Sequence, residues 1–239
     1  MRGKIVLILI FVSVGIFAKA EPEAATKKRS KFDISATMMT KHIWRAMPSG
    51  TAPTIEPIMT YSYNNLSVSA WSAYAFDNSY TEVDFWATYD FKYFQIGVYD
   101  YYCPNSKMEI NEFTDYRSLT SPKLSEVQAI FKGFKQFPIS ISACTFVAGG
   151  DRDSNGNQQY SSYFELGYNT NLLKRNFDFR VGATPFKGMY ADRFAVFNYS
   201  MKIKDNLKVG DKYQIPVQGG LTYNAVQKNL FFTFGITLK

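Results

Sequence analysis

The sequence predicts an all-β fold, a transmembrane antiparallel up-and-down β-barrel of about twelve strands. Three observations support this prediction: twelve short segments alternate apolar and polar residues, an export-type segment precedes them, and aromatic residues are dense near the segment ends. In the last segment, residues 231–238, one face carries Phe232, Phe234, Ile236 and Leu238. Period-2 alternation indicates a strand between two different environments. Its repetition along the chain is typical of a bacterial outer-membrane barrel.

The first twenty residues form a predicted signal peptide. Arg2 and Lys4 give a basic start, residues 5–17 are apolar, and the small residues Ala18 and Ala20 fit a cleavage site. The alternative is a membrane-anchor helix, but the apolar run is shorter than the ~20 residues that a spanning helix needs. The predicted organisation is a signal peptide at 1–20, a periplasmic leader at 21–30 and an outer-membrane barrel at 31–239.

Removal of this segment lowers the formal net charge from +7 to +4, because it contains two lysines, one arginine and no acid. A nucleic-acid-binding protein would carry a clustered basic face. The one such cluster lies in the leader, at residues 27–31, and indicates a solvated segment or a contact with anionic lipid or a periplasmic polymer. The sequence therefore predicts no nucleic-acid partner.

The composition also favours a barrel with a lipid face and a wet face. Aromatic residues make up 17% of the chain, with 21 Phe and 17 Tyr, yet the mean hydropathy is slightly negative. Beyond the signal segment, no apolar run approaches the length of a membrane helix. A soluble β-sandwich or lipocalin-like barrel is the alternative, but such a protein would turn its polar face outward.

Each strand is placed where the alternation is clearest, in segments of about ten residues, the length of a tilted membrane strand. The predicted strands are 31–44, 54–63, 66–76, 80–91, 93–102, 123–132, 137–148, 159–170, 177–184, 194–204, 212–223 and 229–238. The connections alternate between longer ones, such as 103–122, and tighter ones, such as Asn64-Asn65. Outer-membrane barrels keep short turns on the periplasmic side, so we expect both termini there.

A resemblance extends over about a fifth of the chain. It rests on Trp44-Arg45, then residues 53–57 (PTIEP), 66–71 (LSVSAW) and 82–84 (EVD). These segments resemble an uncharacterised outer-membrane β-barrel family related to the TorF-type porins. The family usually has Gly where this chain has Ala46, and often Gln where it has Glu56. The resemblance implies an outer-membrane barrel of the porin type and transfers no catalytic residue.

The residues opposite the apolar faces are predicted to point into the barrel. The carboxylates among them are Asp33, Glu56, Glu82, Asp84, Asp90, Glu126, Glu165 and Asp178, and the bases are Lys41, Arg45, Arg180, Lys202 and Lys204. Four acids fall on the second to fourth strands and three bases on the ninth and tenth. Because strands four and ten are opposite in a ring of twelve, these groups would set a transverse field across an open lumen. In a closed lumen they would pair, with Glu56 the expected partner of Arg45.

From this arrangement the sequence predicts a porin-like channel for passive diffusion of small polar or charged solutes. The lumen and selectivity candidates are Arg45, Glu56, Glu82, Asp84, Asp90, Glu165, Arg180, Lys202 and Lys204. The expected partners are outer-membrane lipids and small solutes. A closed structural or surface-recognition barrel is the first alternative, and twelve strands lie between the filled and the open barrel sizes.

A lipid-modifying enzyme is the third hypothesis. His42, the one histidine, is predicted to face outward near the headgroups, with Ser49 in the next loop and Glu56 beyond it. Nucleophilic catalysis needs such groups in mutual reach, and an outward histidine would not reach an inward carboxylate. The sequence therefore predicts no catalytic residue, no metal site and no cofactor.

The loop at residues 151–157 (DRDSNGN) resembles part of a calcium loop but lacks the bidentate Glu, so a hairpin turn is the simpler interpretation. Cys103 and Cys144 would form a disulfide only if loop 103–122 folded into the lumen as a plug.

Two residues break the alternation of apolar and polar positions. Asp100 falls on an apolar face, which predicts a bulge or an exit from the hydrocarbon, and Pro216 in mid-strand predicts a bulge.

Overall fold

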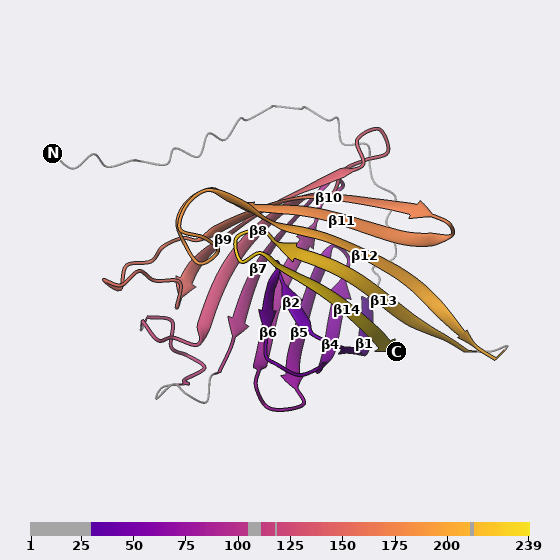
Figure 1. Cartoon of the computed structure of the whole chain (residues 1–239), viewed down its shortest axis with the longest axis horizontal. Helices are drawn as coiled ribbons and strands as arrows, with labels where there is room; N and C mark the ends of the chain where they lie inside the picture. The colour runs from indigo at the N-terminus through magenta and orange to yellow at the C-terminus, as the bar shows by residue number, and fades with distance from the viewer. Residues whose placement is uncertain (1–29, 105–110, 118, 211–212) are drawn as a thin grey trace.

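Twelve antiparallel strands close into one barrel, and two further short strands form a separate hairpin (Figure 1). This computed structural model describes residues 30–104, 111–117, 119–210 and 213–239. The predicted signal peptide and leader lie outside these residues, apart from Ser30, which begins the first strand. Within the described ranges, no helix is long and apolar enough to cross a membrane.

The predicted strand number and the antiparallel order are confirmed. The barrel strands are β1 (Ser30–Met39), β4 (Thr54–Tyr63), β5 (Leu66–Ala75), β6 (Thr81–Asp90), β7 (Phe94–Tyr102), β8 (Lys123–Phe131), β9 (Ile139–Gly149), β10 (Ser162–Leu172), β11 (Arg175–Thr184), β12 (Ala195–Val209), β13 (Tyr213–Asn224) and β14 (Asn229–Leu238). Each pairs with its neighbour, and β1 closes the ring against β14. Two predicted ends are wrong: β1 stops at Met39, not residue 44, and β12 continues to Val209, not residue 204.

The two ends of the barrel differ in their connections. At one end, which we call the short-turn end, lie tight turns such as Asn64-Asn65 and Leu173-Lys174, together with the start of β1 and the C-terminus. At the other, the long-loop end, lie the connections 40–53, 76–80, 103–122, 150–161, 185–194 and 225–228. This asymmetry agrees with the alternation predicted from the sequence and with outer-membrane barrels in general.

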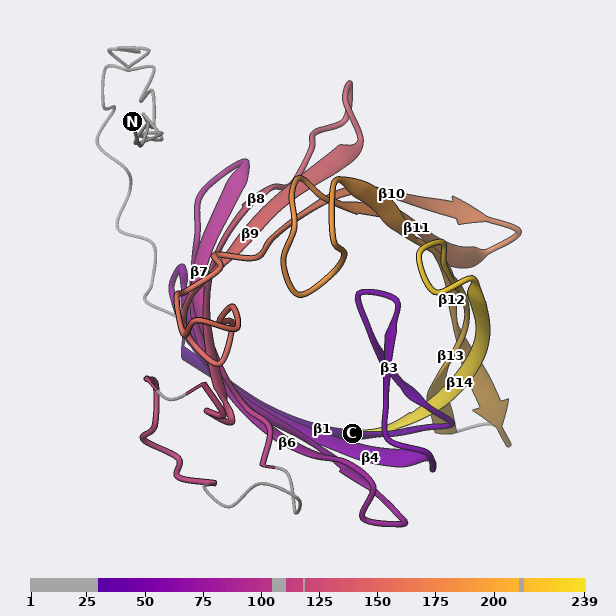
Figure 2. The same ribbon diagram turned by 60° about the vertical axis from the view of Figure 1, so that its left-hand side comes forward.

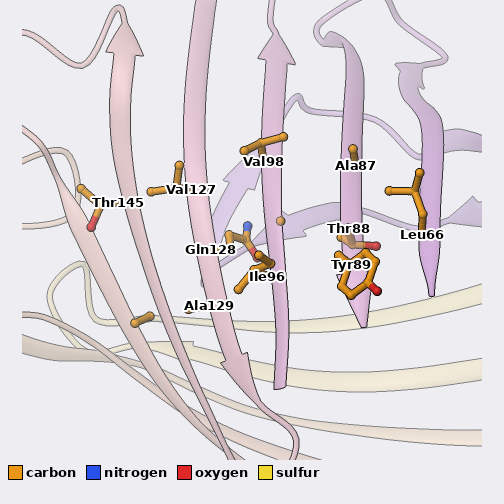
Figure 3. Close-up of a pocket in the computed structure, with 12 residues that line it drawn as sticks. Leu66, Ala87, Thr88, Tyr89, Ile96, Val98, Val127, Gln128, Ala129 and Thr145 are labelled. Atoms are coloured by element: carbon orange, nitrogen blue, oxygen red, sulfur yellow. The ribbon is translucent and has the colours of Figure 1, made fainter. Parts of the chain in front are cut away.

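The outer wall of the barrel is apolar. Large hydrophobic side chains at alternate positions lie more than a third exposed, among them Ile34, Ile96, Leu166 and Phe232. A soluble protein rarely exposes a continuous apolar surface of this extent, whereas a bilayer solvates it. A groove of about 500 Å³ on this wall, shown in Figure 3, is lined mostly by apolar residues, including Leu66. It would face acyl chains in a membrane, so it is not a solute site.

Asp100 keeps its place on the outer wall, so the predicted bulge is wrong. The register of β7 with β6 and β8 runs through it without a shift. Asp100 pairs with Lys123, which is completely buried, and accepts a hydrogen bond of 3.2 Å from Tyr116. The described part of the loop that supplies Tyr116 lies outside the ring (Figure 2). Lys123 Nζ is 3.9 Å from the centroid of the Phe113 ring in this loop. The ion pair is thereby shielded from lipid.

The sequence allowed loop 103–122 to fold into the lumen as a plug, but the described part of this loop does not do so. Its described part lies outside the ring, and Cys103 and Cys144 are both free thiols. Cys103 instead donates a hydrogen bond of 3.2 Å to Glu82.

Pro216 does not cause the predicted bulge. It stands opposite Asn206 in an unshifted register between β12 and β13. Pairing of β13 with β14 begins only at Val217, so Pro216 lies at an edge of the sheet on that side. A proline is tolerated at such an edge position.

Candidate functional site

A short hairpin enters the barrel from the long-loop end. It comprises β2 (His42–Trp44) and β3 (Met47–Ser49), and Figure 2 shows it inside the ring. The turn residues Arg45 and Ala46 have φ angles of 47° and 60°. Positive φ at both central residues is the mark of a type I′ turn. The predicted strand 31–44 is therefore wrong beyond Met39, because the chain leaves β1 there and folds inward.

The hairpin fills the lumen near the long-loop end with aromatic side chains. Trp44 and Ala46 pack against Tyr101, Phe146, Tyr163, Tyr190 and Phe197, which come from β7, β9, β10, β12 and the β11–β12 connection. Phe146 and Phe197 are completely buried. The β11–β12 connection also bends over the lumen in Figure 2. The barrel is thus packed like a protein core at this end.

Arg45 fixes the tip of the hairpin to the barrel wall. Its guanidinium makes two hydrogen bonds, of 2.6 and 2.8 Å, to the two oxygens of Glu126 on β8. It also lies over the rings of Trp44 and Tyr163, at 4.4 and 4.6 Å from their centroids. Such bidentate pairs are the strong form of an ionic hydrogen bond. The predicted pairing of Arg45 with Glu56 is wrong, because the hairpin carries Arg45 across the lumen.

His42 occupies the place beside Glu56. Its Nδ1 lies 3.0 Å from Glu56 Oε1, and its ring stacks on Tyr80 at 5.7 Å between centroids. The predicted outward position of His42 is therefore wrong, since it belongs to the inserted hairpin and not to a wall strand. Ser49 stands opposite His42 in the hairpin register. However, Nε2 of His42 has no hydrogen-bond partner in the described chain, so the Ser49 hydroxyl does not complete a triad.

A polar contact at the long-loop end anchors the base of the hairpin. The Thr51 hydroxyl donates to Asp77 Oδ2 at 2.5 Å, and Ser79 donates to Asp77 Oδ1 through its hydroxyl and its backbone N–H. These donors, with the Ser79 hydroxyl foremost, lower the pKa of Asp77 to about 2. The Asp77 carboxylate therefore stays ionised under ordinary acid conditions.

The acidic candidates of β4 and β6 lie close to the hairpin. Glu82 and Asp84 are buried, and Glu82 accepts hydrogen bonds from Tyr80 and Cys103. Asp84 Oδ1 has no partner within the described residues. Asp90 lies apart from them, near the short-turn end, where it pairs with Lys132 at 2.9 Å. The structure thus brings Glu56 and Glu82 together around His42 and leaves Asp90 outside this group.

The basic candidates line the opposite side of the ring. Arg180 on β11 pairs with Asp178 at 2.5 Å and with Glu165 at 3.3 Å. Lys202 and Lys204 on β12 are exposed to water and have no carboxylate within 4 Å among the residues described. In the register, Lys202 is opposite Asp178 on β11 and Gly220 on β13, and Lys204 is opposite the uncharged Asn176 and Gln218. These two lysines show that the lumen is wet along this wall.

Two polar cavities mark the open part of the lumen. One, of about 250 Å³, lies between the hairpin and β10–β13, and its charged lining residues are Arg45, Glu165, Asp178, Arg180 and Lys202. The second, of about 490 Å³, is at the short-turn end and includes Lys174, Lys204 and Gln218. Lys202 and Lys204 are two residues apart on one face, about 7 Å along the strand. The lumen is therefore filled near the long loops and open toward the short turns.

The ring order supports the predicted separation of charge. β6 and β12 are six positions apart in the closed ring of twelve strands, so they lie on opposite sides. Glu82 and Asp84 belong to β6, and Lys202 and Lys204 belong to β12. The hairpin stands between them, so the two groups do not form ion pairs with each other.

Sequence reasoning missed several residues of this site. Tyr163 and Tyr190 lie against Arg45, and Asn198 donates a hydrogen bond to Tyr163. Nothing in the spacing of these residues in the sequence sets them apart. Glu126 is one of the predicted inward acids but not one of the selectivity candidates, although it is the partner of Arg45.

Loop 151–157 contains a local turn. Its Asp153 side chain accepts hydrogen bonds from the backbone N–H groups of Asn155 and Asn157, which is typical of such turns.

Comparisons with known proteins add one structural likeness. No family model matches the sequence, and no curated protein matches it. A solved structure described as "KdgM porin" is similar, with a TM-score of 0.47 and 10% sequence identity, over 88% of this chain and 99% of that chain. The barrel itself follows from the closed strand order above. A relation to the TorF-type family stays a prediction.

Proposed function

We propose that this protein is a porin-like channel of the bacterial outer membrane, through which small polar or charged solutes diffuse passively. The exposed apolar wall supports the membrane location, and the predicted signal peptide supports export. The observation that carries the transport proposal is the wet basic wall, where Lys202 and Lys204 stay hydrated inside a closed ring. In this proposal the β2–β3 hairpin is the constriction. Glu82 and Asp84 on β6 face Lys202 and Lys204 on β12 across it, while Glu165 lies on the basic side, paired with Arg180.

Conductance in planar bilayers tests this proposal. Purified, folded protein should give small, discrete conductance steps. A variant in which a short flexible linker replaces residues 42–49 should give larger steps, because it removes the side chains that fill the long-loop end. Folding of both proteins is checked by far-UV circular dichroism. If both folded proteins leave the bilayer silent, the channel proposal is wrong.

A closed barrel without transport is the second candidate. The specific observation in its favour is the buried aromatic packing around the hairpin, in which Phe146 and Phe197 are inaccessible to water. In that case the native protein would be silent, and only the hairpin variant would conduct. The same two recordings therefore distinguish the candidates.

A further inference from the structure

The groove of about 500 Å³ on the outer wall lies where one leaflet of a bilayer would meet the barrel (Figure 3). Its lining includes the large exposed side chains of Leu66, Ile96 and Val98. Most of the lining residues belong to the half of β5–β9 nearer the short-turn end. Half of the hydrocarbon core of a bilayer is about 15 Å thick, so acyl chains of the leaflet on the short-turn side would reach this groove.

An aromatic cluster separates the groove from the short turns. Phe94 on β7 is two residues beyond Ile96, about 7 Å along the strand, and is the register partner of Phe131 on β8. Phe134 packs against Phe131, with 5.9 Å between ring centroids, and against Tyr93, with 5.8 Å. Exposed aromatic rings of this kind mark the boundary between hydrocarbon and lipid headgroups.

The two turns beyond this cluster carry an excess of positive charge. The β6–β7 turn contains Lys92, and the β8–β9 connection contains Lys132 and Lys135. Asp90, at the end of β6, is the one acid beside these turns, and it pairs with Lys132 at 2.9 Å. Lys92 lies over the ring of Tyr93 at 4.9 Å, and a ring does not neutralise its charge. Lys92 and Lys135 are exposed, with no carboxylate within 4 Å among the residues described.

The neighbouring turns at the same end do not offset this charge. The β4–β5 turn on one side is Asn64-Asn65, which is neutral. The β10–β11 turn on the other side contains Lys174, and Arg175 beside it pairs with Asp205 at 2.7 Å. This part of the short-turn end therefore has a net positive charge directly beside an apolar groove.

We propose that the groove and the two turns beside it bind an anionic phospholipid, with an acyl chain in the groove and the headgroup phosphate at Lys92 and Lys135. A zwitterionic phospholipid would fill the groove equally well, but its ammonium group would oppose the lysines. A second copy of this chain would bring the same two lysines to a symmetric contact, and like charges disfavour that. The inference rests on the membrane location in the proposed function and does not require that the lumen conducts.

Lipid binding is measured by native mass spectrometry of the folded protein in a non-ionic detergent. The probes are phosphatidylglycerol, phosphatidylethanolamine with the same acyl chains, and glycerol 3-phosphate, which has the phosphate without the chains. Phosphatidylglycerol should bind at least tenfold more tightly than phosphatidylethanolamine, and glycerol 3-phosphate should bind least. Equal affinities for the two lipids, or equal affinities for phosphatidylglycerol and glycerol 3-phosphate, would overturn the proposal.

Lysine variants locate the headgroup. Lys92→Gln and Lys135→Gln should each weaken phosphatidylglycerol binding about fivefold and leave phosphatidylethanolamine binding unchanged. Lys208→Gln is the matched control, because Lys208 is an exposed lysine on β12, on the opposite side of the ring from β6. It should bind both lipids as the native protein does. Unchanged affinity for phosphatidylglycerol in the double variant of Lys92 and Lys135 contradicts the proposed site.

A groove variant locates the acyl chain. Ala143 lines the groove, so Ala143→Phe should weaken the binding of both lipids by filling part of the space. Val147→Phe is the control at an exposed position of the same strand outside the groove. Far-UV circular dichroism checks the folding of both variants. Native-like binding by Ala143→Phe overturns the proposal, and so does a native dimer that this variant dissociates, since a second copy would then cover the groove.

The lipid measurement and the bilayer recording fail independently. A protein that prefers phosphatidylglycerol but is silent in planar bilayers would refute the channel alone. A protein that conducts but binds the two lipids equally would refute this inference alone.

Discussion

At the scale of single residues, Arg45 links the hairpin to the barrel. It lies at a turn position with positive φ, where a non-glycine residue costs about 1–2 kcal/mol, and its partner Glu126 is 1% exposed. The sequence showed that Arg45 would face the lumen, but not which carboxylate would meet it. That choice depends on how far the hairpin reaches, and strand alternation holds no information about a segment that leaves the sheet.

Substitution of Arg45 should be costly. Arg45→Met leaves Glu126 buried without its cation, and breaking a buried pair in this way costs about 3–5 kcal/mol. The free energy of unfolding, measured by urea titration in detergent micelles, should fall by that amount. The control is Arg175→Met, because the Arg175–Asp205 pair is exposed and should contribute less than about 1 kcal/mol. Equal losses in the two variants would show that Arg45 does not hold a buried pair.

Gly182 provides space for Tyr163. A Cβ atom built at Gly182 would lie 2.1 Å from the Tyr163 hydroxyl and 2.5 Å from the ring carbon that bears it. Gly182→Ala should therefore displace the ring that packs on Arg45, at a cost of about 1–3 kcal/mol in unfolding free energy. Gly219→Ala is the matched control, since no atom lies within 4 Å of the added carbon. A loss no larger than that of the control would contradict the assigned contact.

At the scale of elements, the wall strands were predictable and the inserted hairpin was not. Each wall strand separates lipid from lumen, so its side chains alternate clearly and its bounds follow from the pattern. Residues 40–49 continue a similar alternation, and their turn lacks the Gly or Asn that usually marks a type I′ hairpin. The error at His42 followed directly, because its face was extrapolated from a strand that ends at Met39.

The β7–β8 loop is the second element that sequence could not place. Asp100 signalled an anomaly on the outer wall, but its partner lies 23 residues away and both are covered by the loop. The loop folds outward because Phe113 and Tyr116 can cover the Lys123–Asp100 pair there. An unpaired charge at this position would otherwise face lipid.

Double-mutant analysis tests this arrangement. Asp100→Leu alone leaves the buried Lys123 unpaired and should lower the unfolding free energy by about 3–5 kcal/mol. The double variant Asp100→Leu with Lys123→Met should recover most of that loss, because two apolar residues can replace a buried pair. Recovery is measured as the coupling energy of the cycle. Additive losses would mean that the two side chains do not interact.

At the scale of the whole molecule, the barrel combines an apolar exterior with an unevenly filled interior. The closed strand order gives the ring, the inserted hairpin fills the long-loop end, and the basic wall of β11 and β12 stays wet toward the short turns. The sequence predicted the ring and the opposite positions of β6 and β12, because both follow from strand order. It could not predict how much of the lumen is filled, since that depends on the packing of loops from different parts of the chain.

A spin-label accessibility scan along residues 199–204 of β12 in lipid bilayers tests most directly whether this strand separates lipid from a hydrated lumen. Labels at Tyr199, Met201 and Ile203 should be reached by oxygen dissolved in the lipid. Labels at Ser200, Lys202 and Lys204 should be reached by a water-soluble nickel complex, because they line a hydrated lumen. The predicted result is a two-residue alternation between the two reagents. Equal access of the nickel complex to all six positions would contradict a lipid-facing barrel, and its exclusion from Lys202 and Lys204 would contradict a wet lumen.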